Sequence, residues 1–289
     1  MGFSVHLLSD GISYWDGGGA FGLVPRTKWI KILPPDEENR VPQALRCVLV
    51  QAGGQNILVD CGVGDKPNEV IAAQYDVRRP NGNLLDDLAR LGLTAADIHT
   101  VVFTHLHGDH AGWATRLAGD PPVCIPTFPN ARYYVQRQEY HDATHTNERT
   151  RNTYFPDNYV ALTEAGVLTL LDGEAEIAPQ VRVAPTPGHT AGHQSVLIEA
   201  SPHWQNEALK SAPALILGDM ATYMIQFARL PWVTAYDVLP LVNIETKRAW
   251  QAWAYSHGAL LISPHDTQTP VGRLTKTDKG FFTVDPATL

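Results

Sequence analysis

A cluster of four possible metal ligands within six residues constrains this 289-residue chain more than any other feature. The segment His105-Leu106-His107-Gly108-Asp109-His110 follows the apolar run Val101-Val102-Phe103, which is typical of a buried strand. In extended backbone, side chains two positions apart point to the same side, so the first two histidines face one way. The last two ligands follow where the strand ends. Because imidazole and carboxylate groups are ligands that zinc and similar cations prefer, the cluster predicts a metal site.

Three further candidate ligands lie downstream. His189 and His265 each follow an apolar, strand-like run, and Asp219 ends a third such run. Loops that leave buried strands are a common place for functional groups, because a rigid scaffold holds them. Together with the first cluster, these residues make seven candidate ligands, enough for two metal ions with open coordination positions.

The pattern HxHxDH, followed by His, Asp and His, resembles the metallo-β-lactamase superfamily. The resemblance extends from about residue 45 to residue 266. It implies an α/β fold, a four-layer αβ/βα sandwich of the metallo-β-lactamase type, with residues 1–289 forming one domain. Hydrophobic periodicity by itself predicts only a mixed α/β class.

The resemblance also implies how the ligands are shared. The first metal would be held by His105, His107 and His189, the second by Asp109, His110 and His265, and Asp219 would bridge them. The ions are expected to be zinc, with iron, manganese or cobalt as alternatives. A metal-bridging hydroxide, available near neutral pH because metals lower the pKa of bound water, would attack a lactone, ester or thioester carbonyl. Asp109 is the candidate for orienting this nucleophile and carrying a proton to the leaving oxygen.

The substrate class is narrowed by Asp219. The commonest zinc β-lactamases have Cys at this position, so the resemblance disfavours drug hydrolysis. The chain resembles the branch of the superfamily that contains quorum-quenching lactonases. This resemblance lies at residues 17–25, 39–40, 58–66, 231–232 and 236–237. We therefore expect a metal-dependent hydrolase that acts on a small-molecule lactone or ester.

Tyr223, four residues after Asp219, is a second candidate catalytic residue. In lactonases of this superfamily, a Tyr close to the bridging Asp donates a hydrogen bond to the substrate carbonyl. A phenol in that place would stabilise the developing oxyanion. The alternative is a wall residue whose hydroxyl is bonded elsewhere.

Four other polar residues are interpreted from their positions. His193 and Asp60 are predicted to support metal ligands by hydrogen bonding. His141 and His145 have the spacing of a helical metal pair, but no carboxylate or further His completes the set, so neither is expected to bind metal.

Charge and composition limit the partners. The chain has 22 Lys and Arg against 30 Asp and Glu, a net charge of −8, without a basic stripe, so no nucleic-acid partner is expected. No apolar stretch is long enough to span a bilayer, and the start has no signal-peptide pattern. Three cysteines are expected to be reduced thiols, which favours a cytoplasmic location. Residues 142–158 are expected to form a solvated connector, with a lid or the contact of a homodimer as alternatives.

Apolar runs and periodicity predict the elements coarsely. Strands are expected at residues 3–8, 44–51, 56–60, 99–104, 132–136, 181–184, 195–199, 214–218 and 259–263. Helices are expected at residues 83–91, 137–143 and 242–257. The last helix should bury an apolar face that contains Ile244, Trp250, Trp253 and Ala254, and residues 201–212 should form a solvated excursion between strands.

Three other functions remain open at this stage. Persulfide dioxygenases of the superfamily use a similar His/Asp set with one iron, and a phosphodiesterase would use the same two-metal site, although the acidic charge disfavours a nuclease. A non-enzymatic sensor would keep the site without turnover. Metal analysis separates the oxygenase from a dinuclear hydrolase, and turnover on lactones and aryl esters separates an enzyme from a sensor.

Overall fold

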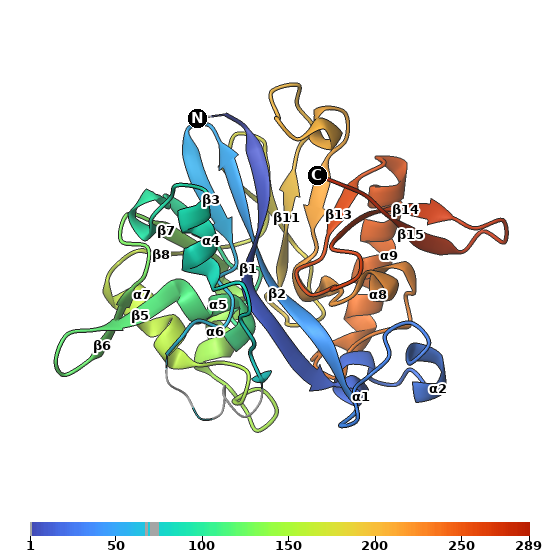
Figure 1. Cartoon of the computed structure of the whole chain (residues 1–289), viewed down its shortest axis with the longest axis horizontal. Coiled ribbons are helices and arrows are strands. Elements are labelled where there is room, and N and C mark those ends of the chain that lie inside the picture. Colours follow the sequence, from blue (N-terminus) through green and yellow to red (C-terminus); the bar gives the residue numbers. More distant parts are fainter. Residues whose placement is uncertain (1, 67–68, 70–74) are drawn as a thin grey trace.

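The computed structural model describes residues 2–66, 69 and 75–289, which form two β-sheets packed face to face (Figure 1). The strands are β1 (Ser4–Asp16), β2 (Arg40–Ala52), β3 (Gln55–Val59), β4 (Thr100–Val102), β5 (Thr115–Ala118), β6 (Val123–Pro126), β7 (Arg132–Gln136), β8 (Leu168–Leu171), β9 (Ala175–Ala178), β10 (Val181–Pro185), β11 (Gln194–Ile198), β12 (Ala214–Ile216), β13 (Leu260–Ile262), β14 (Val271–Lys276) and β15 (Phe282–Pro286). The α-helices are α1 (Gly17–Phe21), α2 (Arg26–Trp29), α4 (Leu84–Arg90), α5 (Gly108–Ala111), α6 (Arg137–Thr144), α7 (Val160–Glu164), α8 (Met224–Ala228) and α9 (Pro240–Ser256). Short 3₁₀ helices are η1 (Ala95–Asp97), η2 (Gly112–Ala114), η3 (Pro156–Asn158), η4 (Glu207–Lys210) and η5 (Gly218–Met220).

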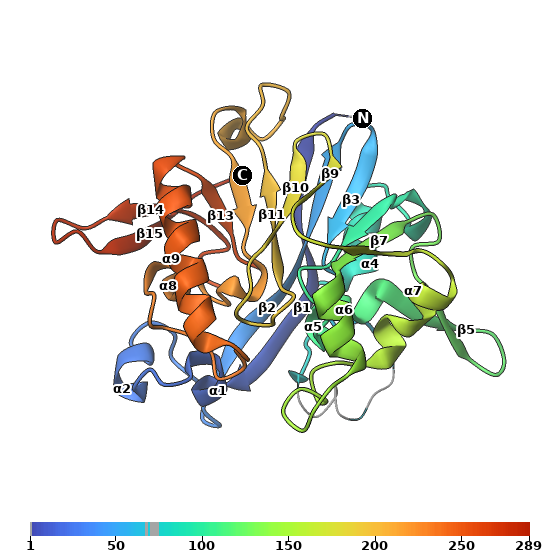
Figure 2. The ribbon, with the colours of Figure 1, turned by 180° about the vertical axis from the view of Figure 1, so that it is seen from behind.

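The two sheets divide the chain into an N-terminal and a C-terminal half. The first sheet has the order β1-β2-β3-β4-β7-β8, and the second has the order β15-β14-β13-β12-β11-β10-β9. The strands β5 and β6 form a separate hairpin. Helices α4, α5, α6 and α7 lie on the outer side of the first sheet, and α8 and α9 lie on the outer side of the second (Figure 2). The predicted four-layer α/β sandwich is therefore confirmed.

Alternating side chains build the layers. On β2, Val48 and Val50 point into the core between the sheets, where they join Val196 and Ile216 of the second sheet. Their neighbours Cys47 and Leu49 point the other way into the core beneath α4. This period of two, with both faces apolar, is what a sheet buried between another sheet and a helical layer requires.

The first two strands are longer than the sequence pattern predicted. Both β1 and β2 continue well beyond the end of β3, with an irregularity between Ser9 and Ile12. The extension of β2 pairs instead with the C-terminal half, because Ala44 N donates to His265 O at 3.0 Å and Arg46 N donates to Pro264 O at 3.2 Å. A partner that is distant in sequence thus supports strand structure which local apolar patterning does not signal.

The predicted apolar face of helix α9 is confirmed in part, because Ala254 is buried in the core, against which Trp250 and Trp253 pack. Trp250 and Trp253 are only partly buried, whereas Asn243, Lys247 and Gln251 on the adjacent face are buried. Lys247 Nζ donates to the carbonyls of residues 226 and 232, Gln251 Nε2 donates to that of residue 227, and Asn243 Nδ2 donates to Asp237 Oδ2. Hydrogen bonds to the preceding loop therefore decide which face turns inward.

Residues 201–212 also differ from the expectation. They contain η4, and both Trp204 and Leu209 are buried in the core between the sheets. The indole nitrogen of Trp204 donates to Glu199 O at 2.9 Å. The segment is therefore anchored to the core rather than being a solvated excursion.

The pattern missed six strands, namely β5, β6, β8, β9, β14 and β15. Three of them, β8, β9 and β15, are sheet edges, where partial exposure mixes polar and apolar residues. In the part of the chain that the structure describes, no helix is both long enough and apolar enough to cross a bilayer.

The buried Lys247 makes stability depend on pH. Burial lowers its pKa from 10.5 to about 8, so its stabilising contribution is fully present above pH 10.5 and is lost as the pH falls through about 8. We expect the free energy of unfolding of the wild-type chain, relative to Lys247→Met, to rise by on the order of 3 kcal/mol between these limits. Urea unfolding at a series of pH values measures this difference. Lys210→Met, which changes a surface lysine, is the control and should give a flat difference; a flat result for Lys247→Met would contradict the prediction.

Candidate metal centre

The seven predicted ligands meet where strands of both sheets end. His105 and His107 lie in the segment after β4, and Asp109 and His110 lie in α5. The other three candidate ligands follow strands of the second sheet: His189 after β10, Asp219 in η5 after β12, and His265 after β13. None of the seven side chains is more than 6 % exposed.

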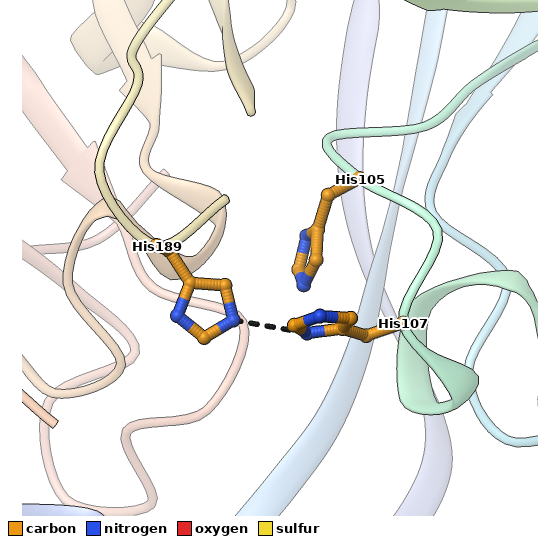
Figure 3. A group of neighbouring side chains, drawn as sticks. All are labelled: His105, His107 and His189. Carbon is orange, nitrogen blue, oxygen red and sulfur yellow. Dashed lines mark hydrogen bonds between the residues drawn. The ribbon is translucent and has the colours of Figure 1, made fainter. Parts of the chain in front are cut away.

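His105, His107 and His189 form one group of ligands (Figure 3). Their ligand nitrogens lie within 4.8 Å of one another, and His189 Nε2 is 3.1 Å from His107 Nδ1. The side chains of His105 and His107 come from one ribbon and that of His189 comes from the facing one (Figure 3). The predicted first set is therefore brought together across the two halves.

Asp109, His110 and His265 form the second group. The Nε2 atoms of His110 and His265 are 3.0 Å apart, and they lie 3.7 Å and 3.8 Å from Asp109 Oδ2. This set also joins the two halves of the chain.

Asp219 lies between the groups and turns one oxygen toward each. Its Oδ2 is 3.4 Å from His189 Nε2 of the first group. Its Oδ1 is 2.9 Å from His265 Nε2 and 3.4 Å from His110 Nε2 in the second. This is the position that a bridging carboxylate would need.

Two buried atoms indicate that the donor set fits metal ions. His105 Nε2 and Asp219 Oδ1 have no hydrogen-bond partner among the described residues. Leaving such groups unpaired in the interior costs free energy, and a cation is the partner that imidazole nitrogen and carboxylate oxygen share. Tetrahedral or five-coordinate sites of His and Asp ligands suit zinc and similar ions.

Four of the five candidate histidine ligands are held through one ring nitrogen, His107 being the exception. The pairs are His105 Nδ1 with Thr104 Oγ1 at 3.0 Å, His110 Nδ1 with Asp60 Oδ2 at 2.9 Å, His189 Nδ1 with Asp237 Oδ1 at 2.9 Å, and His265 Nδ1 with Ala44 O at 2.7 Å. Such contacts fix the tautomer and direction of a metal ligand. The supporting role predicted for Asp60 is thereby confirmed.

His193 also has the predicted supporting place. Its Nε2 accepts a hydrogen bond from the main-chain nitrogen of Asp219 at 2.9 Å, and its Nδ1 lies 2.8 Å from Thr186 Oγ1. The ring packs against Gly218, where a Cβ would come within 2.6 Å of His193 Nε2. His193 therefore fixes the backbone that carries the Asp219 carboxylate.

Burial and charge set the protonation of the site. Burial lowers the pKa of His105 and His107 well below the usual range, which keeps both rings neutral and able to bind a cation. Burial would raise the pKa of Asp219, but the neighbouring His265 and His110 outweigh it and hold the pKa well below its usual range. The Asp219 carboxylate is therefore ionised.

Two supporting residues were missed by sequence reasoning. Asp237, which holds His189, is itself fixed by Thr234 Oγ1 at 2.9 Å and Asn243 Nδ2 at 2.6 Å. Glu139, fully buried, accepts hydrogen bonds from the main chain of Leu106 and from the side chains of Tyr154 and Thr190. The Tyr236-Asp237 pair, noted only as a point of family resemblance, was the available signal for Asp237; Glu139 had none.

The pocket at the centre has aromatic walls. Its lining includes Trp15, Tyr75 and Tyr236 together with ligands from both groups, and Trp15 makes edge contacts with Tyr75 at 4.9 Å and with Tyr236 at 5.2 Å. The Tyr236 hydroxyl occupies the space beside Gly19, where a Cβ would lie 2.1 Å from it. The run Gly17–Gly19 lies in helix α1, which is capped by Asp16.

Residues 142–158 contribute to this pocket instead of being only a solvated connector. Thr153 lines it, and Tyr154 and Phe155 are buried. Arg149 donates to the main-chain carbonyls of residues 235 and 237 on the opposite side. Part of the segment is therefore a wall of the site.

Three side chains named in the sequence analysis, those of Tyr223, His141 and His145, lie outside the lining of this pocket. Tyr223 is buried, its ring stacks on Phe21, and its hydroxyl donates to Pro42 O at 3.3 Å. The rings of His141 and His145 stack at 4.5 Å on the exposed end of α6, away from the ligand groups found among the described residues.

Comparisons with known proteins identify the family. The model of the metallo-beta-lactamase superfamily matches residues 42–201, so the chain belongs to this superfamily. A protein from Bacillus sp named N-acyl homoserine lactonase is 34% identical over 183 residues, which cover 60% of this chain and 62% of that protein. The chain thus matches about three fifths of the length of this relative.

Solved structures agree in fold. A "probable metal-dependent hydrolase" from Staphylococcus aureus has a TM-score of 0.83 and 27% identity, with 99% of this chain and 98% of that chain covered. AidC, described as a dizinc quorum-quenching lactonase, has a TM-score of 0.77 and 18% identity over 99% of this chain and 94% of its own. At that identity, the second similarity supports the fold alone.

The contact between His193 and Asp219 generates a prediction. His193→Ala removes the acceptor of the Asp219 main-chain N–H, so metal affinity should fall by roughly 10–100-fold, as is usual for groups that support ligands. Competition with a chromogenic chelator measures it. His141→Ala is the control and should leave affinity unchanged; the loss of a metal equivalent in that variant would show that the ligand set is wrong.

Proposed function

We propose that this protein is a dinuclear metal-dependent hydrolase that opens a lactone, with ester or thioester cleavage as the same chemistry on a related substrate. The observation that carries the proposal is the pair of ligand groups, each holding three buried donors, with the two oxygens of Asp219 directed to one group each. The similarity to proteins named N-acyl homoserine lactonase supports a lactone as the substrate class.

The two ligand groups indicate which residues would hold each metal ion and which chemistry the ions would supply. His105, His107 and His189 would hold one ion, and the second group another, with Asp219 shared. Two bound divalent ions, zinc in this proposal, would supply a hydroxide nucleophile at neutral pH and polarise the substrate carbonyl. Zinc suits the donors, and manganese, cobalt or iron are the alternatives.

The chain's own residues would direct the reaction. Asp109 of the second group also lines the pocket, so its carboxylate is the candidate to orient the nucleophile and to carry a proton to the leaving alkoxide. The aromatic walls formed by Trp15, Tyr75 and Tyr236 would exclude water and contact the apolar part of the substrate.

Tyr223 is proposed as a donor to the substrate carbonyl oxygen. Its hydroxyl is 3.3 Å from Pro42 O, a long hydrogen bond for a phenol. To act, the hydroxyl must leave this carbonyl for the oxyanion that forms in the transition state, where a donor is most useful.

An activity screen on metal-quantified protein tests the function. We expect about two metal equivalents per chain. The protein should open the ring of N-acyl lactones, which is measured by the release of acid, and should turn over phosphodiesters more weakly. Asp219→Ala should lower occupancy of the second site and turnover while the fold is kept, because one shared carboxylate is lost. Asp172→Ala, which changes a carboxylate that pairs with Arg137 at the surface, is the matched control.

Two results would contradict this function. One equivalent of iron with oxygen-dependent turnover of a persulfide would make the protein an oxygenase. Full metal content and wild-type turnover in Asp219→Ala would remove the bridging assignment.

The Tyr223 proposal has its own test. Tyr223→Phe keeps the ring and removes the donor, so metal content should stay the same and kcat/KM on the best lactone should fall by about tenfold, less than for a sole oxyanion donor since the metals share the charge. Tyr159→Phe is the control, because it also removes a buried phenol bonded to a main-chain carbonyl. An unchanged kcat/KM for Tyr223→Phe would reduce Tyr223 to a structural residue.

A further inference from the structure

Gln43 on β2 directs its side chain at the metal centre, although no sequence motif marked it. The side chain is 3 % exposed, and its Nε2 lies 3.2 Å from Asp109 Oδ2. An ionised carboxylate only accepts hydrogen bonds, so the amide nitrogen donates. We propose that Gln43 is a positioning residue that holds Asp109 in the orientation needed to bind the second metal ion.

Gln43 is to Asp109 what Asp60 and Ala44 are to the two histidines of the second group. Within the hydrogen bonds of the described residues, the one from Gln43 is the only one that the Asp109 carboxylate accepts. His110 and His265 of the same group are fixed by Asp60 and by a main-chain carbonyl. Gln43 therefore completes a set in which each ligand of the second group has a partner behind it.

The contact selects one oxygen of the carboxylate. Oδ2, which accepts from Gln43, is also the oxygen measured at 3.7 Å and 3.8 Å from the Nε2 atoms of His110 and His265. An amide orients this oxygen without cancelling its charge, whereas a lysine or arginine in its place would compete with the cation.

Strand β2 is a rigid support for this amide. The Gln43 carbonyl accepts from Ser13 Oγ at 3.4 Å on the adjacent β1. The next residue, Ala44, is bonded to His265 twice, through its main-chain N–H and its carbonyl. One short stretch of β2 thus orients two of the three ligands of the second group, whereas His105 and His189 of the first group are held by Thr104 and Asp237.

The arrangement predicts an asymmetric effect on metal binding. This inference rests on the dinuclear part of the proposed function but is independent of its substrate. In Gln43→Met, the affinity for the second zinc equivalent should fall by about tenfold or more, and that for the first should stay the same. Stepwise competition with a chelator measures both affinities, and the visible absorption of the Co²⁺-loaded protein should change only with the second equivalent.

Controls separate positioning from loss of structure. Gln251→Met is the matched control, since Gln251 is also 3 % exposed and donates one hydrogen bond, to Phe227 O; both affinities should be unchanged. Gln43→Asn keeps an amide but shortens its reach, so it should reproduce the loss even if Gln43→Met folds poorly.

The possible results distinguish the inference about Gln43 from the proposed function. An unchanged second affinity in Gln43→Asn, or an equal loss at both sites, would overturn the inference while leaving the function intact. Two ions with the expected asymmetry but no lactone turnover would overturn the substrate proposal alone. A single metal equivalent in the wild-type protein would overturn both.

Discussion

The structure depends on keeping seven metal-binding side chains together in a nearly water-free place. None of them is more than 6 % exposed, and unpaired polar atoms in such a place oppose folding. A bound cation would offset this cost, because several neutral imidazole nitrogens can all coordinate the same metal. The need to bring both ligand groups to one point accounts for where the two sheets meet and why the ligands follow strand ends.

Support for the centre is spread over the whole chain. The ligands are held by Asp60 before α4, by Ala44 on β2, by His193 before β11 and by Asp237 before α9. Such outer contacts cost little individually, but together they fix direction before a metal arrives. Polar burial on α9 belongs to the same system, since Asn243 on its buried face bonds to Asp237.

The candidate ligands could be predicted because each is marked by its local sequence, in which a residue type that can bind metal follows an apolar run. Asp60 and His193 were predictable for the same reason. Gln43 and Glu139 were not, because their roles come from elements far away in sequence, and nothing local distinguishes them from other polar residues. The predicted apolar face of α9 was right for Ala254 and incomplete for the buried polar residues beside it. The acceptors of Lys247 lie in another segment, which periodicity within the helix cannot indicate.

The pairing of Ala44 with His265 joins positions 221 residues apart. Closing so long a loop carries a large entropic cost, so in a folding chain this contact forms after the local hairpins. The second ligand group is incomplete until then. A chain still being synthesised has only its early HxHxDH ligands, and the full set is not assembled before residue 265 has emerged and docked on β2. Completion of the ligand set is thereby coupled to a late tertiary step of folding.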